Sequence, residues 1–363
     1  MHPTRRPPTH LTVIGGGFAG LTAAITATEA GARVTVHEAH HTLGGRARTA
    51  EGPYRTNEGP HALYNGGPHW TWLAQRDLIG PLAPLPPLET ARLRLHHRGA
   101  LRRTPPFAML KLLRPRRTAR PAPVDVDFLT WATEQAGEEA ARAAANYAAV
   151  ALFHHDPGSL SAAFVQERLR RATKLPPEAH YPRGGWASVI DRMAARAWNL
   201  GVRIETRSRV DSLDALTGTG TGTGIGIGIG IGTGNGIGTG TGCRTGMRGP
   251  RTGPIIVATS LDAARRLLQD DSLTWPSGRT VLLDLAVRTR RGDAFAVSDL
   301  DAPGWIERFT AQDRTLAPAG EQLLQGQFPI GPHASRADGI ARAERLLDLG
   351  FPGWRDRVTW RRE

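Results

Sequence analysis

The chain has 363 residues, 40% of them hydrophobic, and a formal net charge of +13 at pH 7. This length predicts two domains with a sizeable core, and no apolar run reaches the ~18 residues that a membrane-spanning helix needs. A single cysteine, Cys243, excludes a disulfide framework within the chain, which favours a reducing, cytoplasmic location.

The most informative pattern begins with an apolar run at residues 11–14, which predicts a strand. The sequence GGGFAG follows at residues 15–20, then a helix of small residues that ends at Gly31, and a second strand over residues 32–37. In a dinucleotide-binding turn, the first glycine permits the tight turn, the second lets the backbone approach a pyrophosphate, and the third lets the helix pack on the sheet. The N–H groups that begin such a helix attract phosphate.

The second predicted strand ends on an acidic residue, Glu38, which is followed by Ala39. Glu38 lies 18 residues after Gly20, close to the spacing of about 20 expected for a carboxylate that binds ribose hydroxyls. A carboxylate at this position repels a 2′-phosphate, so NADP is disfavoured.

A glycine doublet and an arginine, Gly44-Gly45-Arg46, come next. The segment LGGRART at residues 43–49 resembles the second phosphate motif of the flavin amine oxidase and phytoene desaturase superfamily. In that family the doublet and its arginine lie beside the pyrophosphate of FAD. The resemblance implies an FAD-dependent oxidoreductase that removes hydride from an apolar or amine-bearing small molecule.

The segment NEGPH at residues 57–61 resembles a family segment that passes near the isoalloxazine ring. The resemblance makes Gly59 a candidate cofactor contact and His61 a candidate catalytic residue that shapes the ring pocket or handles a proton. A purely structural role for His61, in packing or in capping a turn, stays open.

Arginines concentrate between residues 92 and 120, around the apolar segment PFAMLKLL at residues 106–113. Such a segment with basic flanks suits an anionic membrane surface, so peripheral membrane contact is one interpretation. Codon bias in a GC-rich genome is the other, because the chain has only two lysines, Lys111 and Lys174. No recognition motif accompanies the charge, so nucleic acid is not an expected partner.

The middle of the chain predicts helices over residues 126–136 and 138–152. The segment YPRGGW at residues 181–186 resembles the family's entry to a helix, here 186–200. Strands are predicted over 202–205, 208–210 and 254–259. Val210 matches the family's valine that contacts the adenine, which completes the predicted cofactor-binding set: Gly15, Gly16, Gly17, Phe18, Ala19, Gly20, Glu38, Ala39, Gly44, Gly45, Arg46, Gly59 and Val210.

Residues 217–242 hold thirteen glycines in twenty-six positions. Ordering so many residues costs more free energy than burial of the four central isoleucines returns, so residues 217–253 are predicted to form a flexible loop.

Together these features predict an α/β fold with a Rossmann-like FAD-binding domain (doubly wound, with ββα-type three-layer architecture) and an inserted α+β substrate domain. The expected FAD-binding domain is discontinuous, 9–66 plus 183–262, and the substrate domain comprises 67–182 plus 263–363. No metal is expected, because neither His40-His41 nor His154-His155-Asp156 has the spacing of a zinc site.

The resembling family closes its flavin site with a strand that ends in Gly-Asp and opens a helix. The C-terminal 30 residues show no such pattern, and Gly292-Asp293 precedes the strand-like AFAV instead. A catalytically inactive, truncated remnant is therefore one alternative function, and a basic protein of the membrane surface is another.

Overall fold

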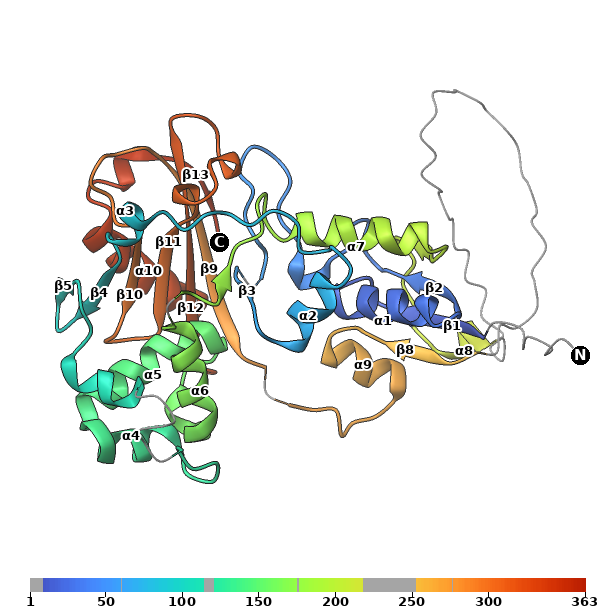
Figure 1. Ribbon diagram of the computed structural model, residues 1–363, viewed down its shortest axis with the longest axis horizontal. Helices are drawn as coiled ribbons and strands as arrows, with labels where there is room; N and C mark the ends of the chain where they lie inside the picture. Colours follow the sequence, from blue (N-terminus) through green and yellow to red (C-terminus); the bar gives the residue numbers. More distant parts are fainter. Residues whose placement is uncertain (1–8, 60, 114–120, 175, 218–252, 276) are drawn as a thin grey trace, which may run out of the picture. The chain divides into compact units, whose positions relative to one another are not determined.

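The computed structural model describes residues 9–59, 61–113, 121–174, 176–217, 253–275 and 277–363 (Figure 1). Most of the predicted flexible loop, residues 218–252, and the basic residues 114–120 lie outside the described residues. The chain divides into two compact units. Unit 1 is Met1–Arg48 with Ala187–Trp275, and unit 2 is Thr49–Trp186 with Pro276–Glu363.

Unit 1 is built on a parallel sheet of four strands in the order β7-β2-β1-β8. The apolar runs of β1 and β2 are buried, as expected for strands of a parallel sheet. The strand order reverses beside β1, and α/β folds bind nucleotides at the carboxyl ends of strands at such a point. The strands are β1 (His10–Ile14), β2 (Arg33–His37), β7 (Arg203–Glu205) and β8 (Ile255–Val257).

The two helices predicted for unit 1, α1 and α7, are present. Helix α1 packs against β2 and against α7. In α7, Val189, Ile190, Met193 and Ala197 are buried at the predicted helical spacing. The elements are α1 (Phe18–Glu29), the 3-10 helix η1 (Gly45–Ala47), α7 (Ala187–Asn199), α8 (Asp214–Thr217) and α9 (Leu261–Leu268).

One predicted strand of unit 1 is wrong. Residues 208–210 form no strand, because the chain leaves the edge of the sheet after β7. Arg207 adopts a left-handed backbone conformation with φ of 54°, and the N–H of Ser208 donates to the carbonyl of Glu38 at 2.8 Å. The segment therefore crosses the end of β2 instead of extending the sheet.

Unit 2 contains a seven-stranded mixed sheet in the order β13-β9-β12-β11-β10-β4-β5 and a two-stranded ribbon of β3 and β6. Within the large sheet, β10 and β4 pair in parallel and the other neighbours pair antiparallel. The strands are β3 (Leu63–Tyr64), β4 (Arg94–His97), β5 (Ala100–Arg102), β6 (Ala179–His180), β9 (Arg279–Arg288), β10 (Ala296–Asp299), β11 (Gly304–Arg308), β12 (Glu321–Ile330) and β13 (Val358–Arg362).

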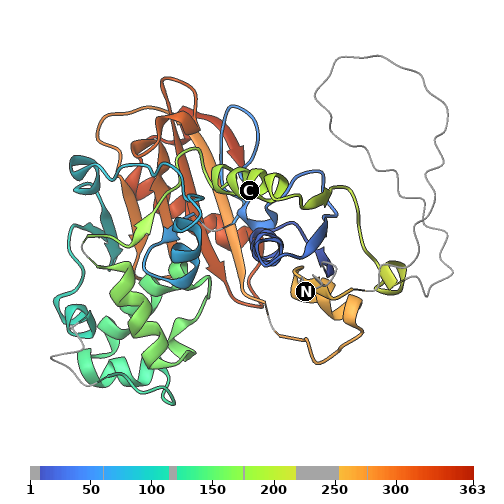
Figure 2. The same ribbon diagram turned by 45° about the vertical axis from the view of Figure 1, so that its right-hand side comes forward.

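Three helices of unit 2, α4, α5 and α6, lie together (Figures 1 and 2). Gly137, with φ of +84°, separates α4 from α5 as the sequence predicts, and seven buried alanines bring α5 close to its neighbours. No described helix is long and apolar enough to cross a bilayer. The helices are α2 (Pro68–Ala74), α3 (Pro87–Thr90), α4 (Phe128–Ala136), α5 (Glu138–Leu152), α6 (Ala162–Ala172), α10 (Arg336–Gly350) and the 3-10 helices η2 (Phe107–Leu113), η3 (Pro157–Ser159), η4 (Phe309–Ala311), η5 (Arg314–Leu316) and η6 (Arg355–Arg357).

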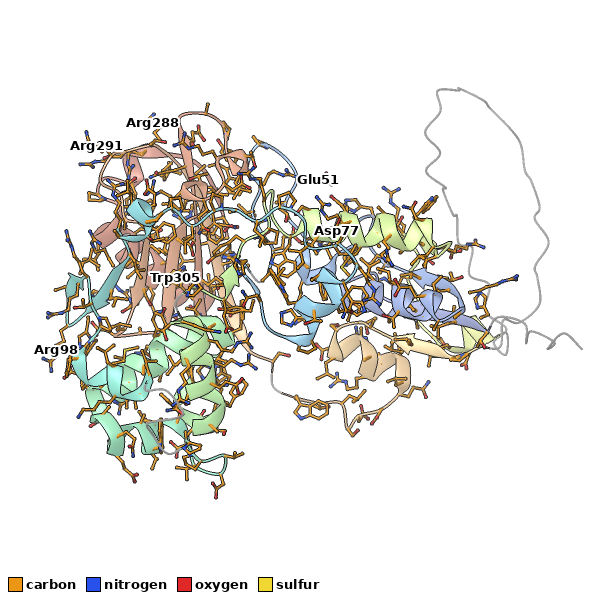
Figure 3. The ribbon with its side chains drawn as sticks, in the orientation of Figure 1. Glu51, Asp77, Arg98, Arg288, Arg291 and Trp305 are labelled. Carbon is orange, nitrogen blue, oxygen red and sulfur yellow. The ribbon has the colours of Figure 1, made fainter. Side chains whose placement is uncertain are left out.

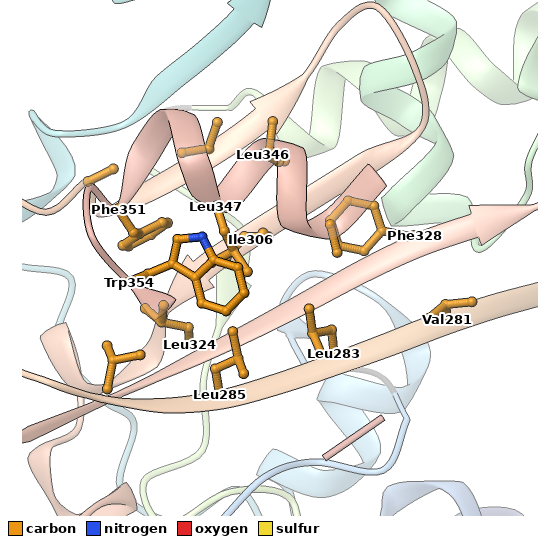
Figure 4. Close-up of a cluster of buried hydrophobic side chains, with 14 of the residues drawn as sticks. Val281, Leu283, Leu285, Ile306, Leu324, Phe328, Leu346, Leu347, Phe351 and Trp354 are labelled. Carbon is orange, nitrogen blue, oxygen red and sulfur yellow. The ribbon is translucent and has the colours of Figure 1, made fainter. Parts of the chain in front are cut away.

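The two faces of the large sheet differ in chemistry. Leu283, Ile306 and Phe328 pack with Leu346 and Leu347 of α10 in an apolar core (Figure 4). The side chains that alternate with these on the same strands point to the opposite face. There the sheet carries buried polar residues, which are Asp284, Ser298, Glu307, Gln325 and Gln327.

Candidate functional site

In unit 1, the turn between β1 and α1 has the tight packing that its glycines predict. Gly15 has φ of +106°, and a Cβ atom there would lie 2.5 Å from the carbonyl oxygen of Ala258. A Cβ atom on Gly20 would overlap the carbonyl oxygen of Gly15. The N–H of Gly15 donates to the carbonyl of His37 at 2.8 Å, which ties the turn to the end of β2. Glycine is therefore required for packing at both positions.

Gly17 differs from Gly15 and Gly20, because a side chain at Gly17 would have free space. It is the N-cap of α1, where no side chain caps the helix, and a Cβ atom on it would meet nothing nearer than the carbonyl oxygen of Gly44 at 3.8 Å. Helix α1 begins directly after Gly17, with Phe18 and Ala19, and has 12 residues. An uncapped helix start with room for a ligand suits a phosphate.

The glycine doublet lies against this turn. The N–H of Gly44 donates to the carbonyl of Gly16 at 2.9 Å, and Gly17 and Gly44 form an isolated parallel bridge. Gly45 begins η1, in which Arg46 is exposed. The two predicted phosphate-binding motifs therefore lie next to each other in unit 1.

Glu38 is buried, with 6% of its surface exposed, at the carboxyl end of β2. Its Oε2 accepts from the N–H of Gly16 at 2.7 Å and its Oε1 accepts from the N–H of His40 at 2.8 Å, so the carboxylate is fixed beside the glycine turn. A carboxylate accepts about four hydrogen bonds, which leaves capacity for two hydroxyl groups.

The segment that contains Val210 runs beside this carboxylate. The N–H of Arg207 donates to the carbonyl of His40, and that of Ser208 donates to the carbonyl of Glu38, both at 2.8 Å. Val210, two residues further on, is half-buried, as is Ala39. Twelve of the predicted cofactor residues thus belong to unit 1, and Gly59 and His61 belong to unit 2.

Unit 2 holds a small pocket against the segment that contains His61. Tyr181, Pro182 and Gly185 of the predicted YPRGGW segment form part of its wall. The N–H of Gly184 donates to Asp313 at 2.6 Å and fixes this segment. The pocket is lined by Asn57, His61, Ala83, Tyr181, Pro182, Gly185, Phe309, Gln312, Asp313 and Leu316.

His61 is buried, and its ring packs edge-on against Phe309 with 4.8 Å between the ring centroids. Burial, with a smaller contribution from the positive charge of Arg362, lowers the pKa of His61 to about 3. The imidazole is therefore neutral near pH 7. Within the described part of the chain its Nε2 has no hydrogen-bond partner.

Behind the pocket wall lies a buried carboxylate, Glu307 of β11. Its Oε2 accepts from Tyr181 Oη at 3.0 Å and from Trp305 Nε1 at 3.1 Å, and its Oε1 accepts from Gln312 Nε2 at 2.5 Å. Figure 3 labels Trp305 on the large sheet of unit 2. Burial raises the pKa of Glu307 to about 7 despite these donors. Tyr181 and Gln312 both line the pocket, so Glu307 is hydrogen-bonded to two residues of the pocket wall.

A second buried carboxylate follows in the same row of the sheet. Asp284 pairs across the strands with Gln325, which pairs with Glu307. Arg362 of β13 donates to Asp284 Oδ2 at 2.7 and 3.0 Å, and Gln325 Nε2 donates to Asp284 Oδ1 at 3.1 Å. Burial raises the pKa of Asp284, and Arg362 opposes this shift.

Sequence reasoning missed this polar face. Glu307 and Asp284 stand in short alternating strands, where a charged residue normally marks the face exposed to water. Glu307 is buried because α10 packs on one face of β11 and α5 on the other, and Asp284 is buried beside Arg362 of β13.

Among the described residues, His96, Asp299 and Asp301 are close enough to hold a metal ion together. Their carboxylates already accept from the backbone N–H groups of Arg98, Asp301 and Ala302, and His96 Nδ1 lies 2.8 Å from Asp299. The cluster therefore has a structural explanation at the turn after β10.

Comparison with known proteins agrees with this architecture. Residues 13–78 match the family model of an NAD(P)-binding Rossmann-like domain. No curated protein sequence matches the chain.

Solved structures match almost the whole chain. A protein of Pyrococcus furiosus is 16% identical, with a TM-score of 0.70 over 97% of this chain and 87% of its own. An oxidoreductase from Methanosarcina mazei is 17% identical with the same TM-score and coverage. Cyclohexylamine oxidase from Brevibacterium oxydans is 17% identical, with a TM-score of 0.62 over 98% of this chain and 84% of its own. These likenesses confirm the predicted α/β fold with its Rossmann-like domain, and they show that the chain shares the fold of a cyclohexylamine oxidase.

Proposed function

We propose that this chain, which has the fold of the flavin amine oxidases, is an FAD-dependent oxidoreductase. Its proposed reaction removes hydride from an apolar or amine-bearing small molecule. The observation that carries the proposal is the junction of the glycine turn, the glycine doublet and the Glu38 carboxylate in unit 1. A solved relative in fold is a cyclohexylamine oxidase, which favours the amine-bearing class.

The residues of unit 1 fit the adenine and pyrophosphate portions of FAD. We propose that Gly16, Gly17 and the first turn of α1 bind the pyrophosphate, with Gly44, Gly45 and Arg46 on its other side. Glu38 binds the ribose hydroxyls with its remaining acceptor capacity, and its charge excludes a 2′-phosphate. Val210 lies two residues beyond the segment that crosses Glu38, which suits contact with the adenine.

When bound, a flavin supplies the acceptor of hydride, and the protein supplies orientation and the electrostatic environment. We propose that the pocket of unit 2, with His61, Tyr181 and Phe309, shapes the environment of the reaction. His61 stays neutral near pH 7, so it provides a hydrogen-bonding group without a positive charge. Gly59 precedes it in the segment that resembles the ring-contacting segment of the family.

The test is FAD affinity in matched carboxylate variants of unit 1. Glu38→Ala removes the ribose acceptor, and we expect about tenfold weaker binding, since a hydrogen bond to a charged group contributes ~1.5–3 kcal/mol. Glu29→Gln is the control, because Glu29 stands at the opposite end of α1. Fluorescence titration of FAD gives both affinities. If the wild-type protein does not bind FAD, the result favours the alternative that the chain is a catalytically inactive remnant. If both variants bind FAD as tightly as the wild type does, Glu38 does not contribute to FAD binding.

A second proposal concerns the apolar segment of η2. Phe107 is 83% exposed and Leu110 is 44% exposed, while Met109 and Leu112 of the same helix are buried. Lys111, Arg102 and Arg103 are exposed nearby in the sequence. Exposed aromatic and aliphatic side chains with basic neighbours favour contact with an anionic membrane surface.

A further inference from the structure

Two residues that line the pocket of unit 2 each have a buried polar atom without a hydrogen-bond partner among the described residues. Gln312 is 6% exposed and His61 is 7% exposed, and both line the pocket. Within the described residues, neither Gln312 Oε1 nor His61 Nε2 has a hydrogen-bond partner. A buried polar atom without a hydrogen-bond partner costs free energy, so two such atoms among the residues of one pocket favour a ligand that pairs with them.

The orientation of the Gln312 amide follows from its neighbour. Glu307 accepts from Tyr181, Trp305 and Gln312, and an ionised carboxylate accepts hydrogen bonds but donates none. Gln312 therefore turns its NH₂ group to Glu307. Because Glu307 does not line the pocket, the carbonyl oxygen is the polar atom of Gln312 that is left for a ligand.

We propose that Gln312 is a specificity-determining residue, whose carbonyl oxygen accepts a hydrogen bond from an N–H group of the substrate, and that Glu307 is the positioning residue that holds this oxygen available. The inference rests on the proposed function for the reaction itself. It selects the amine-bearing class of substrate over the purely apolar one, because an apolar molecule leaves the acceptor unpaired.

The protonation of Glu307 controls this arrangement. A protonated Glu307 donates a hydrogen bond, and the Gln312 amide then turns its oxygen to Glu307 and its NH₂ group to the pocket. Burial raises the pKa of Glu307 to about 7, so this change falls near neutrality. Binding of an N–H donor is accordingly stronger above this pH than below it.

The tyrosines around Glu307, and His61, do not change charge near pH 7. Burial raises the pKa of Tyr64 on β3, of Tyr147 on α5 to about 12, and of Tyr181 well above 10. His61 stays neutral because its pKa is about 3. The charged groups nearby are Arg168, Arg171 and Glu178, which interact with Tyr64, and the Asp284–Arg362 pair in the same row of the sheet.

The experiment compares two probes of equal charge on the full chain loaded with FAD. Benzylamine in its ammonium form has N–H donors, and benzyltrimethylammonium has none. Calorimetric titration is expected to show that Gln312→Leu weakens benzylamine at least tenfold and leaves benzyltrimethylammonium unchanged. Gln322→Leu is the matched control. Gln322 is a buried glutamine of β12 on the α10 face of the sheet, and its oxygen also has no hydrogen-bond partner among the described residues.

A second variant keeps the test decisive if Gln312→Leu does not fold. Glu307→Gln preserves size, and benzylamine binding is then expected to lose its rise between about pH 6 and pH 8, an effect that a merely structural role does not produce. Equal benzylamine affinity in Gln312→Leu and wild type overturns the proposal, as does an unchanged pH profile in Glu307→Gln. Loss of FAD in Gln312→Leu with unchanged benzylamine binding also overturns it, because the oxygen then serves the cofactor. A wild-type chain that holds no FAD contradicts the proposed function instead, and benzylamine binding is then measured on the free chain.

Discussion

Replacing Gly17 or Gly20 by alanine separates the ligand-binding role of the glycine turn from its packing role. At Gly17 the new methyl group meets nothing nearer than 3.8 Å, and the residue has an ordinary extended conformation with φ of −76°. The loss of glycine at the N-cap and the smaller entropy of the unfolded chain oppose each other, so the free energy of unfolding changes by less than about 1 kcal/mol.

At Gly20 the same methyl group overlaps the backbone carbonyl of Gly15, which cannot move without moving β1. We expect a loss of about 1–3 kcal/mol, the range for overpacking in a tight interior. Urea unfolding followed by circular dichroism measures both values.

The binding of FAD distinguishes the two positions further. Gly17→Ala fills the place proposed for the pyrophosphate, so FAD binds at least tenfold more weakly to a chain of normal stability, as measured by flavin fluorescence. Normal FAD affinity in Gly17→Ala refutes the placement of the pyrophosphate. Wild-type stability in Gly20→Ala refutes the packing of α1 against the turn.

Three further predictions concern unit 2. Burial raises the pKa of Glu307 from 4.5 to about 7, so the folded state binds this proton more tightly than the unfolded state, and the free energy of unfolding falls by roughly 3 kcal/mol as the pH rises between these two values. Urea unfolding at about pH 5 and 7.5 measures this decrease. The same decrease in Glu307→Gln contradicts its attribution to Glu307. Arg362→Leu leaves the carboxylate of Asp284 buried without its ion-pair partner, which lowers the free energy of unfolding by about 3 kcal/mol, and the double variant with Asp284→Leu recovers much of this loss. Thermal denaturation compares the single and double variants with the wild type. Additive effects of the two substitutions contradict the energetic coupling of Asp284 with Arg362. Phe107→Ser reduces co-sedimentation with anionic vesicles at low salt, whereas Leu88→Ser, at an exposed leucine outside η2, does not. Equal sedimentation of both variants contradicts the contact of η2 with the membrane surface.

The sequence was sufficient for the parts of the fold that depend on local chemistry. The β1–α1–β2 unit follows from buried apolar runs and from glycines at positions where a side chain would collide. The break between α4 and α5 follows from Gly137, whose φ of +84° suits glycine. In each case neighbouring residues decide the structure.

The parts that sequence reasoning missed depend on contacts between distant segments. Residues 208–210 have the composition of a strand, yet hydrogen bonds to the end of β2 take them across the sheet. Glu307 acquires its environment from Tyr181, 126 positions away in the sequence, and Asp284 acquires its partner from Arg362, 78 positions away. No pattern within a strand specifies such partners. The predicted domain boundaries and the roles of the site residues stay predictions.

The most direct test of the central claim is a crystal structure of the chain soaked with FAD. We expect the pyrophosphate to lie against the backbone of Gly16 and Gly17, with Gly44 and Gly45 beside it, and a ribose hydroxyl to donate to the carboxylate of Glu38. Density for FAD elsewhere, or no FAD at a concentration that saturates binding in solution, contradicts it.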